Sequence, residues 1–157
     1  MAAQTPLGID LLPEPLQRPL TCEGRPARVI GTIAEECDIV EFGDDGSVAV
    51  HDRVAGETHP LNRDRPSLES FLDAFATYLE TGPPDVPPTI YTAGEMAARL
   101  ADLRAGRIKP QPRPAPQLSH RKRLARLRAR LTEVDAAALA RGHWWRGTLE
   151  EARDDLL

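Results

Sequence analysis

The most constraining feature of this sequence is a change of hydrophobic period between residues 38 and 79. Residues 38–42 and 47–52 are short runs rich in β-branched side chains, and the Gly-Asp-Asp-Gly segment between them is typical of a turn. A second turn containing Gly56 leads to a further strand-like run at 57–61. This pattern predicts two consecutive β-hairpins.

After residue 66 the apolar residues recur with the spacing of one face of an α-helix. Ser67 is placed to cap the N-terminus of this helix, and Pro66 disfavours an earlier start. We therefore predict a helix over residues 67–80 that covers the sheet. The residues of its apolar stripe are Leu68, Phe71, Leu72, Phe75 and Leu79.

The regions before and after this central stretch are expected to contain one more strand and three more helices. Residues 1–27 contain five prolines and are expected to be mostly irregular, and a strand is expected at 28–33. Three further helices are expected: one capped by Thr92, one beginning near Ser119 and one capped by Thr148. The first and third of these carry a glutamate three residues after the cap, as in a capping box.

Eight of the 15 prolines lie between residues 81 and 118 and predict an irregular, basic stretch there. The length of 157 residues suits a single domain over 1–157 that contains this stretch. The expected fold class is α+β, with a small, mostly antiparallel sheet packed by helices. Its interior should bring together Ile39, Val48, Val50 and Phe71.

Charge is distributed unevenly along the chain. Residues 1–100 carry 17 acidic and 7 basic groups, a net charge of -10, whereas residues 101–157 carry 7 acidic and 13 basic groups, a net charge of +6. Either the two halves neutralise each other in the fold, or they form two surfaces for two kinds of partner.

The basic half suggests nucleic acid as one such partner. No acidic residue occurs between Arg104 and Arg130, and a basic helix over 119–131 could lie on phosphates. Aromatic residues for base stacking are absent from this segment. A nucleic-acid-associated regulatory protein is therefore the alternative hypothesis for function.

Catalytic patterns are not found. Ser67 and Ser70 lack the glycines of a nucleophile elbow, and the carboxylates around Cys37 should raise its thiol pKa, which disfavours a nucleophile. Cys22 and Cys37 are too few for a disulfide scaffold and are expected to be reduced. We predict no catalytic residues, and a binding protein rather than an enzyme.

The second hairpin contains two possible metal ligands. His51 and His59 could lie close across its turn, with Asp52 nearby, but the sequence supplies no third convergent ligand and no recognised metal motif. We predict no metal site and no cofactor. No apolar run approaches the ~20 residues of a membrane span, and the N-terminus does not resemble a signal peptide, so a cytoplasmic location without membrane contact is expected.

The order of these motifs resembles a known family, the SUKH superfamily of bacterial immunity proteins, and most closely its fourth group. The resemblance rests on a strand, a glycine-containing hairpin and a Ser-Leu-x-x-Phe helix start, followed by an Asp, a Trp and a short leucine-rich helix. In this chain these motifs are Val-Glu-Phe-Gly-Asp-Asp-Gly-Ser-Val-Ala-Val at 40–50, Gly56, Pro-Ser-Leu-Glu-Ser-Phe-Leu at 66–72, Val134-Asp135, Trp144-Trp145 and residues 149–157.

The resemblance implies a cytoplasmic protein that binds and neutralises a cognate toxin, commonly a nuclease or deaminase domain, without a cofactor. It leaves the identity of the toxin and the oligomeric state open. Toxins that act on nucleic acid tend to have basic clefts, into which an acidic partner can be steered. From charge alone, the expected partner-binding residues are Glu35, Glu36, Asp38, Asp44 and Asp45.

Overall fold

A computed structural model of the chain describes residues 6–34, 36–82, 90–109 and 118–157. The chain forms two units. The first combines Met1–Thr81 with Ser119–Leu157, and the second is Gly82–Leu118. The expected irregular stretch 81–118 therefore coincides closely with a separate unit that interrupts the first.

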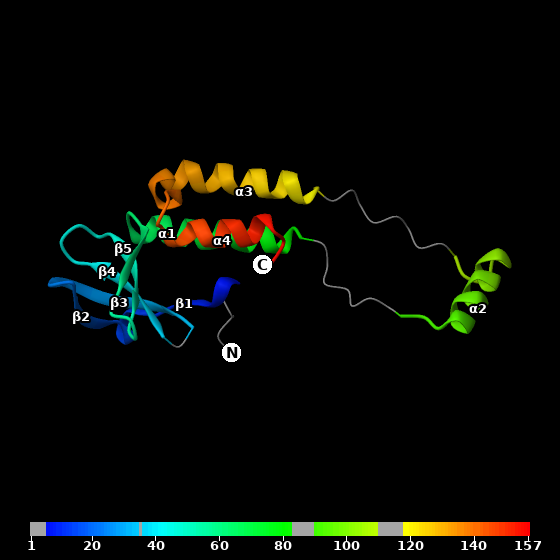
Figure 1. Ribbon diagram of the computed structural model, residues 1–157, viewed down its shortest axis with the longest axis horizontal. Coiled ribbons are helices and arrows are strands. Elements are labelled where there is room, and N and C mark those ends of the chain that lie inside the picture. Colours follow the sequence, from blue (N-terminus) through cyan, green and yellow to red (C-terminus); the bar gives the residue numbers. More distant parts are fainter. Residues whose placement is uncertain (1–5, 35, 83–89, 110–117) are drawn as a thin grey trace. The chain divides into compact units, whose positions relative to one another are not determined.

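The described residues of the first unit form a six-stranded antiparallel sheet and three α-helices (Figure 1). The sheet order is β1-β3-β4-β5-β6, with β2 also paired to β3. The expected α+β class with a sheet packed by helices is thus confirmed. The strands are β1 Ile9–Leu11, β2 Arg18–Cys22, β3 Arg25–Ile33, β4 Cys37–Phe42, β5 Val48–Asp52 and β6 Thr58–Asn62, and the helices are α1 Arg65–Glu80, α3 His120–Asp135 and α4 Trp144–Arg153.

The helices cover one face of the sheet and form the main core with it. Trp145 of α4 lies between Phe71 and Phe75 of α1, with ring centroids 5.3 Å away in both cases. The expected interior is confirmed, because Ile39, Val48, Val50 and Phe71 all belong to this cluster. A short 3-10 helix, Ala136–Leu139, joins α3 to α4 along the end of β6.

The other face of the sheet is covered by its own N-terminal hairpin. Cys22, at the end of β2, lies against His51 of β5 and Thr58 of β6, so β2 folds over the strands on the far side of the sheet. A smaller apolar cluster fills the space beneath it, formed by Cys22, Val29, Val40, Phe42 and Ala49.

The expectation of an irregular segment 1–27 is wrong, because β1, β2 and the first residues of β3 lie in it. Pro19 lies in β2, which pairs on one side with β3, and Pro26 is the second residue of β3. Proline is tolerated at such edge and entry positions because no interior hydrogen bond is lost there. The turn between the strands has positive φ at Glu23 and Gly24, as a two-residue hairpin requires.

Gly31 allows one edge of β3 to pair with β2 along its first part and with β1 along its last part. β3 pairs with β2 up to Val29 and with β1 from Gly31, and its register with β4 shifts at this point. A Cβ atom on Gly31 would lie 2.8 Å from the carbonyl oxygen of Asp10. Glycine is therefore needed for β1 to approach.

Two predicted helix starts are wrong. α1 begins at Arg65, and its N-cap is Asp64 rather than Ser67, with Pro66 in the first turn where its missing N–H costs no hydrogen bond. α4 begins at Trp144, so Thr148 lies inside the helix rather than at its cap. By contrast, α3 begins at His120, next to Ser119, as expected.

The second unit contains one described helix, α2 Ala93–Arg104. Its predicted capping box is confirmed: the Thr92 side chain accepts a hydrogen bond from the backbone N–H of Glu95, and the Glu95 carboxylate accepts one from the backbone N–H of Thr92. The apolar side chains Met96, Leu100 and Leu103 of this helix are exposed.

The cap of α1 gives a testable consequence. We expect Asp64→Ala to lower the free energy of unfolding by about 1 kcal/mol at pH 7, because its carboxylate accepts a 2.8 Å hydrogen bond from the Ser67 N–H. Hydrogen bonds from the Ser67 side chain and backbone hold the pKa of Asp64 below its ordinary value of 3.8. Such a carboxylate stabilises the fold above its unfolded pKa, and this contribution is lost as the pH falls through the folded value.

The difference between wild type and D64A should therefore shrink between about pH 5 and pH 2 in urea titrations. Asp73→Ala, an exposed position on the same helix, is the matched control and should change stability by less than about 0.5 kcal/mol. A D64A penalty no larger than that of D73A would show that the cap is not formed.

Candidate functional site

Of the five acidic residues expected to bind a partner, the four that the structure describes do not share one face. Glu35 lies outside the described residues. Glu36 is exposed just before β4, whereas Asp44 and Asp45 are exposed in the turn after β4. Asp38 is 2% exposed. The strand between them separates the set into two groups at opposite ends of β4.

Asp38 is held inside the fold by arginines. Its two carboxylate oxygens each accept a 3.1 Å hydrogen bond from Arg18 of β2, and Arg53 approaches to 3.8 Å. This ion pair joins β2 to β4. Asp38 therefore stabilises the folded hairpin and is not available as an exposed contact.

The Asp44-Asp45 turn is held in a fixed orientation by Arg25. The Arg25 guanidinium donates to Asp44 at 2.9 and 2.6 Å and to Asp45 at 2.9 Å, and it lies 3.9 Å from the centroid of the Phe42 ring. The hydrogen bond from Arg25 lowers the pKa of Asp44, and hydrogen bonds from the side chain and backbone of Ser47 lower the pKa of Asp45. Both carboxylates are thus charged and oriented at neutral pH.

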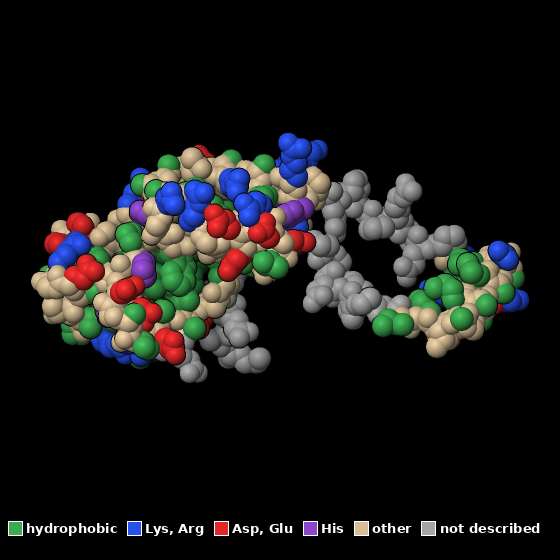
Figure 2. Space-filling view, in the orientation of Figure 1, with side chains coloured by type: hydrophobic (Ala, Val, Ile, Leu, Met, Phe, Trp, Pro, Cys, Tyr) green, Lys and Arg blue, Asp and Glu red, His purple; other side chains and the backbone are tan. Residues whose placement is uncertain are grey.

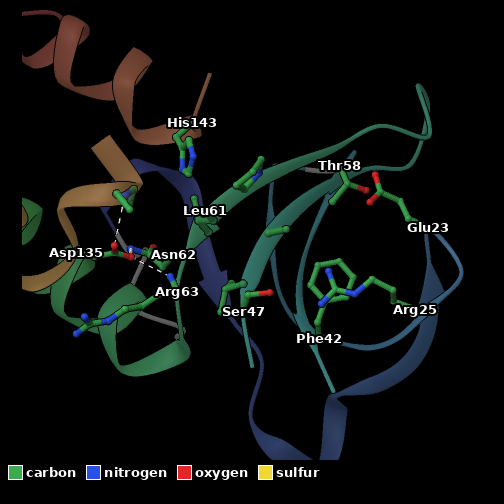
Figure 3. Close-up of a pocket in the computed structure, with 15 residues that line it drawn as sticks. Glu23, Arg25, Phe42, Ser47, Thr58, Leu61, Asn62, Arg63, Asp135 and His143 are labelled. Atoms are coloured by element: carbon green, nitrogen blue, oxygen red, sulfur yellow. Dashed lines mark hydrogen bonds between the residues drawn. The ribbon is translucent and has the colours of Figure 1, made fainter. Parts of the chain in front are cut away.

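Beside this turn the sheet opens into a cavity of about 310 Å³, which we call the sheet cavity (Figure 3). Glu23 and Arg25 of the β2–β3 hairpin and Phe42 of β4 line one side, and Thr58 of β6 lies beside Glu23. Arg25 and Ser47 line it and are the residues bonded to the acidic turn. Asp44 and Asp45 do not line the cavity themselves, but they bond to Arg25 and Ser47, which do. We call the three carboxylates Glu23, Asp44 and Asp45 the acidic rim.

The acidic rim outweighs its cation. The three carboxylates, together with the Arg25 guanidinium that bonds to two of them, carry a net charge of -2. Among the described residues, Glu23 has no ion pair. Its backbone has φ 54°, which turns the hairpin tip at the edge of the opening. The arrangement suits a cationic side chain of a partner.

The other end of the cavity is a buried polar network. Asn62 Oδ1 accepts a 2.9 Å hydrogen bond from the indole N–H of Trp145, and its amide donates to Asp135. Asp135 also accepts from the backbone N–H groups of Arg63 and Ala138. These polar groups already bond to one another, so they tie α3 and α4 to the end of β6.

His143, the residue that precedes α4, lies at the same end of the cavity. Its Nδ1 atom is buried and, among the described side chains, finds no hydrogen-bond partner. A partner group that reached this nitrogen would gain a hydrogen bond without breaking one.

Cys22, His51 and Thr58 form a second polar cluster, under β2. The Cys22 sulfur lies 3.5 Å from His51 Nδ1 and 3.2 Å from Thr58 Oγ1, and the latter two atoms are 3.3 Å apart. Because Cys22 is 2% exposed, its thiol is out of reach of a substrate. The cluster fastens β2 to β5 and β6.

Cys37, His51 and His59 do not form a reactive site. Both cysteines are free thiols, as expected, and the pKa of Cys37 is raised, first by burial and then by the carboxylates of Asp52 and Glu36. His51 is engaged by Cys22 and Thr58, whereas His59 approaches Glu57 at 3.7 Å. No group of three or more metal-binding side chains is present within the described part of the chain.

Sequence reasoning missed Glu23, Arg25, Asn62 and His143. Gly24 is a local turn signal for the β2–β3 connection, because glycine readily adopts a positive φ. Asn62 and His143 carry no local signal, because their roles depend on contacts with residues more than 70 positions away in the sequence or on the cavity itself.

Comparison with protein-family models, with curated proteins and with solved structures finds no significant match to this chain. Within the described residues, no helix has both the length and the apolar character needed to cross a bilayer.

Proposed function

We propose that this chain is an immunity protein that binds a toxin domain and neutralises it by occupying its functional surface. The toxin would be a nuclease or deaminase, and the complex would form in the cytoplasm, where such a toxin meets its substrate. In this role the chain is a binding protein without catalytic activity of its own, and it needs no cofactor.

The first support is the resemblance to SUKH immunity proteins together with the positions of the residues that carry it. Asp135 and Trp145 come from the C-terminal part of the pattern, and both bond to Asn62 at the end of β6. The hairpin and helix-start motifs lie in β4, β5 and α1, which share one core. The motifs therefore stabilise the fold and do not form a reactive site. This is expected for a protein whose function is to present a binding surface.

The observation that carries the proposal is the acidic rim, in which Glu23 lines the sheet cavity and Asp44 and Asp45 bond to Arg25 and Ser47, which also line it. Its carboxylates are exposed, and Arg25 and Ser47 hold two of them in place before any partner arrives. Preorganised charge lowers the entropic cost of binding and steers an oppositely charged surface toward it. An arginine or lysine from the basic cleft of a toxin fits both the charge and the size of the opening.

Binding is favoured over catalysis because the buried polar side chains at the inner end of the cavity, apart from His143, already have structural partners. Asn62, Asp135 and the Arg63 backbone are bonded to one another, and the nearby thiol of Cys22 is buried. A reaction would require groups that are free to take up a proton or attack a substrate. The exposed groups of the rim are instead carboxylates whose pKa values are lowered, in the case of Asp44 and Asp45.

The test is co-expression with toxin-like reading frames that lie next to the gene. We expect one of their products to copurify with the chain in a 1:1 complex and to lose toxicity in its presence. The triple variant E23Q/D44N/D45N should bind that product roughly 10-fold or more weakly, with most of the loss in the association rate and with a smaller salt dependence.

The matched control removes three carboxylates from the exposed side of α1 in the variant E69Q/D73N/E80Q. Its affinity for the same product should stay within about 2-fold of wild type. If no neighbouring product binds or is neutralised, the proposed function is wrong. If both triple variants bind as wild type does, the function stands but the acidic rim is not the contact.

A further inference from the structure

α3 carries a row of exposed cations that do not line the sheet cavity and do not belong to the acidic rim. The buried side of the helix consists of Arg123, Leu127, Leu131 and Asp135. Arg123 turns inward, where its guanidinium lies over the Tyr78 ring and donates to the Tyr78 carbonyl oxygen. The exposed cations of the helix, which we call the α3 row, are Arg121, Lys122, Arg126, Arg128 and Arg130.

The α3 row is poorly neutralised by the protein. Arg130 approaches Glu133 at 3.7 Å, and among the described residues the other four cations have no ion pair. Figure 2 shows Lys and Arg side chains in a line over α3 and α4. Since the acidic half of the chain does not cover this face within the described unit, the charges point to solvent.

The placement of these charges disfavours the isolated helix. Arg121 and Lys122 lie in the first turn, at the positive end of the helix dipole, where no acidic residue is present. Lys122, Arg126 and Arg130 repeat at intervals of four residues, which places like charges next to one another. A polyanion laid along the helix would relieve both repulsions.

The row continues across a groove between α3 and α4. This groove has a volume of about 300 Å³ and is lined by three arginines, Arg128 of α3 and Arg146 and Arg153 of α4. Arg146 also pairs with Glu150 in the groove wall, and Arg153 pairs with Asp154. Guanidinium groups at the sides of an opening of this size match the oxygens of a phosphate.

We propose that the α3 row and this groove bind the phosphate backbone of a nucleic acid. The exposed residues between the cations are small, Ala125 and Ala129, so the face lacks the bulky apolar side chains with which a helix enters a lipid surface. It also lacks aromatic rings on which bases could stack. The contacts are therefore with the backbone, and binding has little sequence preference.

This surface does not depend on the proposed immunity function. The acidic rim lies on the β2–β3 hairpin and the β4–β5 turn, whereas the α3 row lies on a helix that packs on the other face of the sheet. Either surface could fail its own test without affecting the other.

The experiment measures binding of the full chain to a labelled 20-base-pair DNA duplex and to a 20-nucleotide RNA by fluorescence anisotropy at several salt concentrations. We expect dissociation constants of roughly 1–100 μM near 50 mM salt, weakening steeply as salt rises. The variant R126Q/R128Q should bind roughly 10-fold more weakly and reduce the slope of log K against log salt by about 2.

The matched control R28Q/R65Q removes two cations outside the row and should leave both quantities close to wild type. The inference is overturned if the wild-type chain shows no salt-dependent binding, or if the two double variants weaken it equally. It is also overturned if vesicles of phosphatidylcholine with about 30% phosphatidylserine bind the row more tightly than either nucleic acid, since the surface would then be a lipid contact.

Discussion

Replacing Trp145 with alanine is expected to lower the free energy of unfolding by about 4 kcal/mol. The side chain is fully buried, and its ring lies 5.3 Å from the rings of both Phe71 and Phe75. The change would leave a large cavity between α1 and α4. It would also remove the 2.9 Å hydrogen bond to Asn62, whose buried acceptor would lose its partner.

Trp144→Ala is the matched control, since the adjacent tryptophan packs at the margin of the same core and is partly exposed. Its cost should be less than half that of W145A in urea denaturation followed by circular dichroism. If W145A does not fold, Trp145→Phe keeps a ring in the core and should cost about 1–2 kcal/mol through the lost N–H donor. Equal costs for W144A and W145A would contradict this account of the core.

Replacing Asp135 with alanine is expected to cost about 3 kcal/mol. The carboxylate is 6% exposed and accepts hydrogen bonds from the Arg63 N–H at 2.9 Å, the Asn62 amide at 3.4 Å and the Ala138 N–H at 3.4 Å. Without it, three donors at the junction of β6, α3 and α4 would be left without this acceptor. Loss of a partner for buried donors costs more than a typical exposed contact contributes.

Glu133→Ala is the control for Asp135, because it lies two residues earlier on the same helix and its side chain is 75% exposed. It should change stability by less than about 0.5 kcal/mol. Combined with W145F, D135A should be non-additive by at least about 0.5 kcal/mol, because both side chains bond to Asn62. Additive effects, or a D135A cost no greater than that of E133A, would refute the network.

Much of the fold could be predicted because its signals are local. The apolar period of 67–80 and the glycine turns around 43–46 and 56 depend on neighbouring residues, and the structure places α1, β4, β5 and β6 where they were expected. The predicted helix start at Ser67 was wrong because Asp and Ser are both favourable N-cap residues, and in the structure the earlier one, Asp64, caps the helix. β2 was not predicted because Pro19, which lies within it, is typical of irregular structure.

The candidate site could be predicted only in part. Charge density along the sequence indicated both ends of β4, and Asp44 and Asp45 do bond to Arg25 and Ser47, which line the sheet cavity. It did not reveal that Asp38 is buried against Arg18, because that pairing depends on β2 folding across the sheet. Glu23 lines the cavity because the β2–β3 hairpin, although its turn is local, folds over the far face of the sheet.

By itself, the sequence determined the α+β class, the two hairpins, the helix that covers them and the excess of cations in the C-terminal half. These properties follow from residue type and spacing, which act over a few positions. Only the tertiary structure decided which charges are exposed, which are neutralised and which side chains meet at a cavity. An ion pair or a hydrogen bond depends on separation in space, and residues such as Asn62 and Trp145, far apart in the chain, become neighbours only when the sheet and helices pack.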